Sequence, residues 1–184
     1  MFRSLYLRLV FLKIWLERRD LIYRGWSVIY SFKGSTIKIG SGTSLFSSFT
    51  SNMLGLYQRC IIVARYGGYI ELGQKCGISG STIYAWDSIK IGNHTCIGAN
   101  CKIIDNDFHP LSYSQRINIE QKDKVKKRPI IIGECCFIGA NSIILKGTTL
   151  GKNVVVGAGS VVCGTFPDNV IIAGNPAKIV KENK

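Results

Sequence analysis

The chain has 184 residues, 46% of them hydrophobic, and a formal net charge of +13 from 24 Lys and Arg against 11 Asp and Glu. This length predicts one domain with a core of its own. The positive charge favours acidic partners, such as phosphorylated small molecules or anionic lipid. The sequence carries no helix-turn-helix, zinc-finger or aromatic-basic RNA motif, so we expect no binding of nucleic acid.

The cysteines and histidines limit the disulfide and metal chemistry of the chain. Seven cysteines, an odd number, form no regular disulfide framework, which suits a reducing compartment. The Cys135-Cys136 pair lacks metal-ligand spacing. A three-histidine zinc site is excluded because the chain has only His94 and His109. We therefore expect no metal.

Residues 1–26 are rich in large apolar side chains and in Arg and Lys. Four leucines fall on one helical stripe: Leu5, Leu9, Leu12 and Leu16. Basic residues interrupt the apolar run, so it is shorter than the ~20 residues that span a bilayer. No small-residue cleavage site marks a secretory signal. We expect a basic, apolar helical segment over residues 1–30.

Two interpretations of this segment stay open. In the first, the helix packs on the main domain and caps it. In the second, it lies in the surface of an anionic membrane, with Trp and Leu buried and Arg at the headgroups. The second would place a cytoplasmic protein peripherally at the inner face of a bacterial inner membrane.

Residues 130–164 repeat every six residues. Aliphatic side chains recur at that spacing without a break: Ile132, Ile138, Ile144, Leu150, Val156 and Val162. Glycine directly follows four of them, and mostly small or β-branched residues stand two positions before each. An α-helix has a period of about 3.6 and a plain strand a period of about 2. The six-residue period instead predicts an all-β fold, a parallel β-helix in which each hexapeptide forms one wall.

The same phase occurs earlier in the chain. Expected rungs are Ile91, Ile97 and Ile103, and, one residue out of step, Leu72, Ile78 and Tyr84. Three cysteines occupy the small-residue position and are expected in the core: Cys76, Cys101 and Cys136. We expect the β-helix over residues 31–181, with a C-terminal tail over residues 165–184.

The repeat stops between Ile103 and Ile130, which predicts an excursion loop over residues 105–129. A long non-repetitive segment inside a compact domain is usually functional. This loop contains His109, and Pro110 biases the backbone of His109 toward an extended conformation that projects the ring. His94, in contrast, falls inside a rung and is expected to be structural.

Two carboxylates precede the loop histidine. Asp105 and Asp107 are both close enough in sequence to orient the imidazole of His109, and the sequence does not choose between them. The loop ends in a run of basic residues: Lys122, Lys124, Lys126, Lys127 and Arg128. This run either forms a solvated face or attracts a negatively charged acceptor.

The rungs, the histidine-bearing loop and the run Ile172-Ala173-Gly174-Asn175-Pro176-Ala177-Lys178 together resemble the hexapeptide-repeat acyltransferases. The likeness covers residues from about 70 to 181. It points to the branch of galactoside, maltose and polysaccharide O-acetyltransferases. The resemblance implies a left-handed β-helix, an exception to the usual right-handed crossover. It also implies a homotrimer with acetyl-coenzyme A bound between neighbouring subunits.

The resemblance also implies site residues. His109 matches the catalytic histidine, supported by Asp105 or Asp107, and acts as general base on an acceptor hydroxyl. Coenzyme contacts are implied for Phe137, Ala140, Ala158, Gly159, Cys163, Lys178 and Lys181. Acceptor contacts are expected from Ser79, Ser81 and Arg116. The chain departs from the pattern with Phe137 for a common Trp, with Cys163-Gly164 for a Thr-Lys pair, and with Gly80 for an acceptor-binding Asn.

The expected function is acetyl-coenzyme A-dependent O-acetylation of a sugar or of a precursor of surface polysaccharide, O-antigen or capsule. Two alternatives remain. One is N-acetylation of an amino sugar, although relatives of that kind usually carry an α/β nucleotide-binding domain that is lacking here. The other is a non-catalytic scaffold, which would need neither the loop histidine nor the C-terminal motif.

Overall fold

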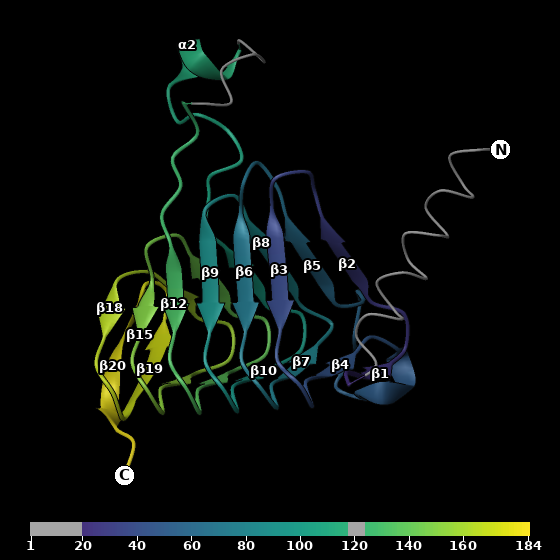
Figure 1. Ribbon diagram of the computed structural model, residues 1–184. Coiled ribbons are helices and arrows are strands. Elements are labelled where there is room, and N and C mark those ends of the chain that lie inside the picture. The colour runs from purple at the N-terminus through teal and green to yellow at the C-terminus, as the bar shows by residue number, and fades with distance from the viewer. Residues whose placement is uncertain (1–19, 118–123) are drawn as a thin grey trace, which may run out of the picture.

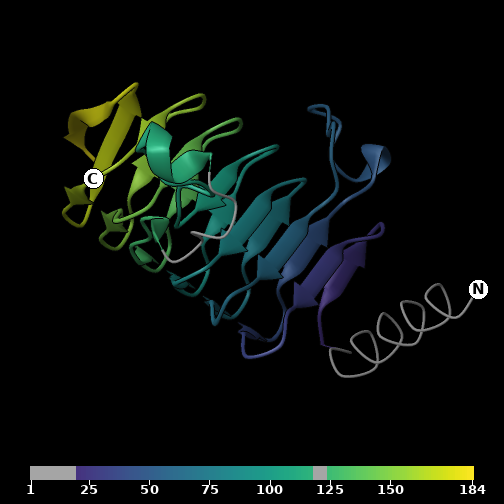
Figure 2. The ribbon, with the colours of Figure 1, turned by 90° about the horizontal axis from the view of Figure 1, so that it is seen from above.

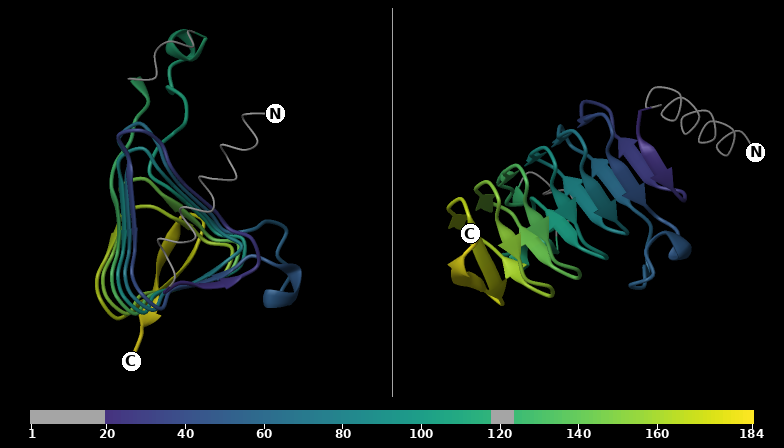
Figure 3. Two further views of the ribbon diagram at one scale, coloured as in Figure 1. Left: turned by 45° about the vertical axis from the view of Figure 1, so that its right-hand side comes forward. Right: turned by 90° about the horizontal axis from the view of Figure 1, so that it is seen from below.

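The computed structural model describes residues 20–117 and 124–184 and has the predicted repeating all-β fold (Figure 1). Short parallel strands stack in three sheets, and each turn of the chain adds one strand to each sheet. In the left panel of Figure 3 the N-terminal coils lie toward the viewer, and the chain runs counterclockwise as it recedes. The β-helix is therefore left-handed, as expected.

The three sheets form the walls of a triangular prism (Figure 3). Sheet A contains β1 (Ile22–Arg24), β4 (Ser44–Phe46), β7 (Gly77–Ser79), β10 (Cys96–Ile97), β13 (Phe137–Ile138), β16 (Val155–Val156) and β19 (Val170–Gly174). Sheet B contains β2 (Val28–Ser31), β5 (Ile61–Ala64), β8 (Thr82–Ala85), β11 (Lys102–Ile104), β14 (Ile143–Leu145) and β17 (Val161–Val162). Sheet C contains β3 (Thr36–Ile39), β6 (Tyr69–Leu72), β9 (Ser88–Ile91), β12 (Ile130–Ile132), β15 (Thr149–Leu150) and β18 (Thr165–Phe166).

The six-residue period arises because each wall directs one large aliphatic side chain inward. Ile138, Ile144 and Leu150, from the three walls of one coil, are at most 1% exposed. In-register pairs such as Ile103 with Ile144 stack the same side-chain type from coil to coil. Each buried aliphatic contributes about 1.5–3 kcal/mol, so the ladder of such residues provides most of the core. One expected rung is wrong, because Ile83 fills the core and the neighbouring Tyr84 faces outward.

Small residues fill the corners, where the chain turns between walls. Their hydroxyls and thiols donate to carbonyls of the next coil, as Thr95 Oγ1 does to Gly133 O at 2.9 Å and Cys101 Sγ to Gly139 O at 3.2 Å. The core location predicted for Cys76, Cys101 and Cys136 is confirmed. Burial raises the pKa of each of these three thiols, which keeps them protonated and unreactive.

The expected start of the β-helix at residue 31 is wrong. β1 pairs with β4 and β2 pairs with β5, so the solenoid includes residues from Ile22 onward. No helix occurs over residues 20–30, because these residues pair their backbone groups with the second coil. Residues 1–19 lie outside the described residues. The choice between a helix that caps the domain and one that lies on a membrane therefore stays open. Within the described part, no helix is long and apolar enough to cross a bilayer.

The C-terminal residues form strands and not the expected tail. β18 and β19 continue sheets C and A, and β20 (Ala177–Glu182) turns back to pair with β19 in the antiparallel direction. β20 thereby covers the edge of sheet A at the last coil, which would otherwise be open to pairing with another chain.

Two segments leave the prism (Figures 2 and 3). Residues 47–60 leave the corner between sheets A and B and include the short 3-10 helix η1 (Phe49–Ser51). Residues 105–129 leave the corner between sheets B and C and carry α2 (Tyr113–Arg116) near their outer end. The second segment is the predicted excursion loop. The first interrupts the second coil between β4 and β5.

Candidate active site

The excursion loop begins where β11 ends and returns to the solenoid at β12 (Figure 1). Its two arms pair at the base. The Arg128 N–H donates to Asp105 O at 2.9 Å, and the Asp107 N–H donates to Lys126 O at 3.1 Å. Asn106 and Lys127 form an antiparallel bridge. The base of the loop is therefore a small hairpin that fixes the residues next to it.

The carboxylate of Asp105 ties this hairpin to the neighbouring coil. Asp105 is completely buried, and its two oxygens accept the backbone N–H groups of Trp86 and Asp87, both at 2.8 Å. The Asn106 side chain donates to the same carboxylate at 3.0 Å. These bonds engage both oxygens inside the fold. Asp105 thus anchors the loop, and of the two expected partners only Asp107 keeps an oxygen without a hydrogen-bond partner among the described residues.

Burial also affects the ionisation of this anchor. Desolvation raises the pKa of the Asp105 carboxyl above its ordinary value, and the three N–H donors act against that rise. The charged form therefore depends on the donors that Trp86, Asp87 and Asn106 supply.

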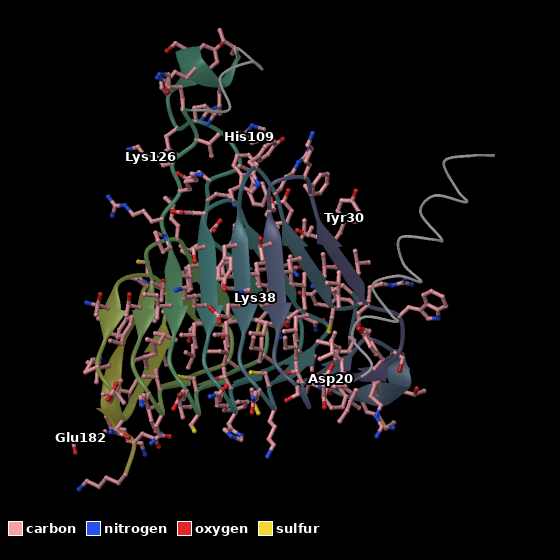
Figure 4. The ribbon with its side chains drawn as sticks, in the orientation of Figure 1. Asp20, Tyr30, Lys38, His109, Lys126 and Glu182 are labelled. Atoms are coloured by element: carbon pink, nitrogen blue, oxygen red, sulfur yellow. The ribbon has the colours of Figure 1, made fainter. Side chains whose placement is uncertain are left out.

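The backbone turns sharply just before the histidine. The Phe108 N–H donates to Asn106 Oδ1 at 2.9 Å, and Phe108 has a φ of 59°. The same left-handed conformation occurs at other turns of the coils, for example at Tyr66 and Cys135, so it belongs to the turn geometry. The turn leaves His109 exposed and Pro110 buried, and the His109 N–H donates to Asp107 O at 2.6 Å. Figure 4 shows His109 on the loop above the sheets.

Asp107 is held from a different coil. Its carboxylate Oδ1 forms a hydrogen-bonded ion pair with Lys146 Nζ, on the turn that follows β14. Its second oxygen, Oδ2, is buried and has no hydrogen-bond partner among the described residues. The His109 imidazole likewise has no hydrogen-bond partner in the described part of the chain. A free carboxylate oxygen thus lies two residues from a free, solvent-facing imidazole, which is the composition that a general base needs.

The expected coenzyme residues lie mostly on the C-terminal coils. Ala140, Ala158 and Gly159 occupy the corner between sheets A and B in successive coils, and the Gly159 N–H donates to Ala140 O at 2.8 Å. Ala158 and Gly159 are exposed, and a Cβ added at Gly159 would have no atom within 4 Å. This corner is therefore lined by small residues and open to a ligand arm.

Phe137 and the two lysines lie on the adjoining outer face of sheet A. Phe137 is 50% exposed and pairs with Val155, which pairs with Ile171, which in turn pairs with Lys181. Lys178 and Lys181 are both exposed on β20, and Lys181 borders a surface pocket that Lys184 also lines. This surface is suited to a long ligand with phosphates at one end. It combines the apolar Phe137 and the small-residue corner with two exposed cations, Lys178 and Lys181.

Cys163 is separated from this group. It follows β17 and lies at the corner between sheets B and C, the same corner as the excursion loop. In one copy of the chain, therefore, the small-residue corner and His109 border opposite edges of sheet B (Figure 3).

The expected acceptor residues are dispersed. Ser81 is completely buried, and its hydroxyl donates within the fold and accepts from the Cys101 N–H at 2.8 Å, so it has no capacity left for a substrate. Ser79 lies on the outer face of sheet A, partly exposed. Arg116 lies in α2 on the outer part of the loop and donates to Leu111 O at 3.1 Å.

Sequence reasoning missed two features of this site. The first is Lys146, which is 39 positions from Asp107 and follows a rung like any other residue. The second is a group of aromatic side chains at the corner from which the loop leaves, including Tyr84, Trp86 and Phe108. The unusual aromatic content of the turns after β5 and β8 was the available signal.

Comparison with known proteins identifies what the chain resembles. The family model described as the hexapeptide repeat of succinyl-transferase matches residues 129–163. The galactoside O-acetyltransferase of Lactococcus lactis is 38% identical over 94 residues, which cover 51% of this chain and 43% of that protein. The chain spans about half the length of the curated relatives that it matches.

Two solved structures extend the likeness to the whole fold. The polySia-specific acetyltransferase NeuO is 26% identical with a TM-score of 0.64, covering 89% of this chain and 65% of that chain. A hexapeptide-repeat acetyltransferase of Vibrio cholerae, solved with acetyl coenzyme A, is 25% identical with a TM-score of 0.60, covering 82% of this chain and 72% of that chain. Both likenesses include the N-terminal coils, which the match to the family model does not reach.

Proposed function

The chain belongs to the hexapeptide-repeat acyltransferase family, and from this premise we propose that it transfers an acetyl group from acetyl-coenzyme A to a hydroxyl of a sugar or glycan. The observation that carries the proposal is the placement of His109. An exposed imidazole stands on a braced loop, two residues after Asp107, whose carboxylate is ion-paired with Lys146. A scaffold protein would need neither the ion pair nor the buried anchor beneath it.

The reaction follows from the chemistry of the imidazole. A ring nitrogen of His109 takes the proton of the acceptor hydroxyl as the oxygen attacks the carbonyl carbon of the thioester. The tetrahedral intermediate collapses, the carbon–sulfur bond breaks, and the imidazolium returns its proton to the departing thiolate. In the reacting complex, an imidazole turned toward Asp107 would be held by this carboxylate in the tautomer that accepts the proton, and the carboxylate would stabilise the imidazolium. Transfer is direct in this proposal, and burial keeps the core thiols Cys101 and Cys136 protonated and unreactive.

The donor occupies the C-terminal coils. The pantetheine arm lies against Ala140, Ala158 and Gly159, and Lys178 and Lys181 attract the phosphates of the nucleotide. Phe137 offers an exposed aromatic face beside the same corner. The acetyl-coenzyme A complex of the Vibrio cholerae relative supports the choice of donor.

The active site is formed between copies of the chain in a homotrimer. Two observations support this. The coenzyme corner and His109 border opposite edges of sheet B, so that one copy by itself separates donor and base. The outer face of sheet B between them is mostly apolar, with Ile143 36% and Leu145 37% exposed beside Lys102 on β11, whereas sheet C presents charged side chains such as Lys38 and Lys90. An apolar face of this kind is typical of a subunit contact.

The acceptor belongs to the sugars and surface glycans. Galactoside and polySia are the acceptors in the names of two similar proteins, which supports this class without choosing a member of it. N-acetylation of an amino sugar is the alternative, and the acceptor panel below distinguishes the two. We place the reaction in the cytoplasm, where peripheral contact with the inner membrane would bring the protein near lipid-linked glycan precursors.

Thiol release from acetyl-coenzyme A tests the function, with neutral sugars, amino sugars and acidic oligosaccharides as acceptors. We expect release with hydroxyl acceptors, and a fall in kcat/KM of about 10²- to 10⁴-fold for His109→Ala. His94→Ala is the matched control, because His94 is also exposed but lies at a distant turn. Equal activity of His109→Ala and wild type would remove the base. Release with amino sugars alone would favour N-acetylation.

A further inference from the structure

Four aromatic side chains and one arginine form a continuous ridge along the corner between sheets B and C: Phe32, Arg65, Tyr66, Trp86 and Phe108. We propose that this ridge binds an acidic glycan chain whose acetylated unit lies at His109. The inference rests on the proposed function, because the bound chain is the acceptor of the transfer. It adds that the acceptor is an extended, negatively charged chain and not a single sugar.

The ridge arises from the coil geometry. Phe32, Arg65 and Trp86 directly follow β2, β5 and β8. The Phe32 and Arg65 N–H groups donate to the carbonyls of Ala64 and Ala85 in the next coil, and the Trp86 N–H donates to the carboxylate of Asp105, the equivalent position one coil further on. Successive coils are about 4.8 Å apart, so three steps from β2 to β11 span about 14 Å. The ridge is therefore long enough for several linked sugar rings in a row.

The rings present both faces and edges along this line. Tyr66 and Trp86 pack edge-to-face with centroids 4.6 Å apart, and Phe108 lies 6.0 Å from Trp86. Tyr66 is 41% and Phe108 40% exposed, although both are large and aromatic. The C–H face of a sugar ring carries partial positive charge and is complementary to the negative face of an aromatic ring. A row of rigid aromatic side chains binds such faces with little loss of conformational entropy.

The charge of the ridge is positive. The Arg65 guanidinium lies 4.6 Å from the Phe32 ring and 4.7 Å from the Tyr66 ring, and no carboxylate pairs with it in the described residues. Lys33 and Lys127 are exposed beside it, and Lys127 Nζ donates to Trp86 O at 3.0 Å. The ridge and its turns thus carry three cations, Arg65, Lys33 and Lys127, against the one carboxylate of Asp87. Stacked, unpaired Arg is suited to a carboxylate-bearing ligand.

One buried donor is also left unused. Trp86 is 8% exposed, and its indole Nε1–H has no hydrogen-bond partner among the described residues. Buried polar groups are nearly always paired, so this donor calls for an acceptor from outside. A hydroxyl or carboxylate oxygen of a ligand bound on the ridge would supply it once the rings that cover Trp86 shift. Phe108 then joins the ridge to His109 directly, and Figure 4 shows His109 and Tyr30, which flanks Phe32, at the same edge of the prism.

The test measures binding apart from transfer. We would titrate the full chain by isothermal titration calorimetry, which needs no acetyl donor. The ligands are oligosialic acid of two to six units and maltooligosaccharides of equal length. We expect binding of oligosialic acid that tightens with chain length up to about four units, weakens with salt, and exceeds that of the neutral chains. Phe32→Ala and Arg65→Gln should each weaken it by about 5- to 10-fold.

Phe49→Ala and Arg59→Gln are matched controls, because both residues are exposed at the corner between sheets A and B. They should change binding by less than about twofold. No binding of oligosialic acid, equal losses in the controls, or equal binding of the neutral chains would overturn the inference. His109→Ala should still bind the chain. If wild type binds it through the ridge but never releases thiol with any acceptor, the ridge stands and the proposed transfer fails.

Discussion

At the scale of single residues, the candidate base is positioned by two carboxylates with different tasks. Asp105 holds the loop base to the turn between β8 and β9, because its carboxylate accepts two backbone N–H groups there. Asp107 forms an ion pair with Lys146, which follows β14. His109 makes its only described hydrogen bond through its backbone. Its position thus depends on residues from three coils.

Replacement of Asp107 tests this positioning. Asp107→Asn removes the charge that pairs with Lys146, so kcat/KM should fall by about 10- to 100-fold while acetyl-coenzyme A binding stays unchanged. Steady-state kinetics and calorimetry with the donor check the two parts. Glu134→Gln is the control, because Glu134 also pairs with a lysine, Lys152, but in an exposed position. An equal loss in the control would contradict a specific role.

Asp105 gives a prediction on pH. Its pKa is raised in the folded protein, so its contribution to stability is complete below the unfolded-state pKa of about 3.9 and is lost as pH rises through the folded value. The free energy of unfolding of wild type minus that of Asp105→Asn should therefore decrease as pH rises from about 4, and then level off. Urea denaturation at several pH values measures it. A difference that grows with pH would show that the N–H donors outweigh burial.

At the scale of elements, the solenoid depends on close approach between coils. A Cβ added at Gly133 would lie 2.3 Å from Gly151 O, and both atoms are backbone-fixed. Gly133→Ala should therefore push the coils apart and destabilise the fold by about 1–3 kcal/mol. Gly77→Ala, whose Cβ would meet only Cys96 Sγ at 3.8 Å, should stay within about 0.5 kcal/mol. Chemical denaturation of the two variants measures the contrast, and similar losses would refute the packing argument.

At the scale of the whole molecule, the prediction concerns a site shared between copies. His109→Ala lacks the base, and Ala158→Trp fills the exposed small-residue corner at which the pantetheine arm is proposed to lie. Each pure variant should be nearly inactive. Trimers reassembled from an equal mixture should recover roughly one quarter of the sites, because a wild-type corner then meets a wild-type loop. Thiol release after reassembly measures this, and no recovery would mean that each copy forms its own site.

The local sequence was sufficient for the repeating unit. Each short wall directs one aliphatic residue into the core. The six-residue spacing of Ile132, Ile138 and Ile144 therefore predicts three successive walls, which together make one coil. The prediction was wrong at the N-terminal boundary and in the tail, because β1 and β20 are paired strands whose sequences lack the repeat. Tyr84 was placed inside for a related reason, since one residue of slip in a strand exchanges its two faces.

The sequence by itself determined the β-helix, the point at which it is interrupted, and the histidine in that interruption, because each is a local departure from a fixed period. Only the tertiary structure decided which carboxylate anchors the loop and which keeps an oxygen free, because that depends on N–H groups of Trp86 and Asp87 and on Lys146. It also decided that Phe32, Arg65 and Trp86 form one line, since coil stacking brings together residues that are far apart in the chain.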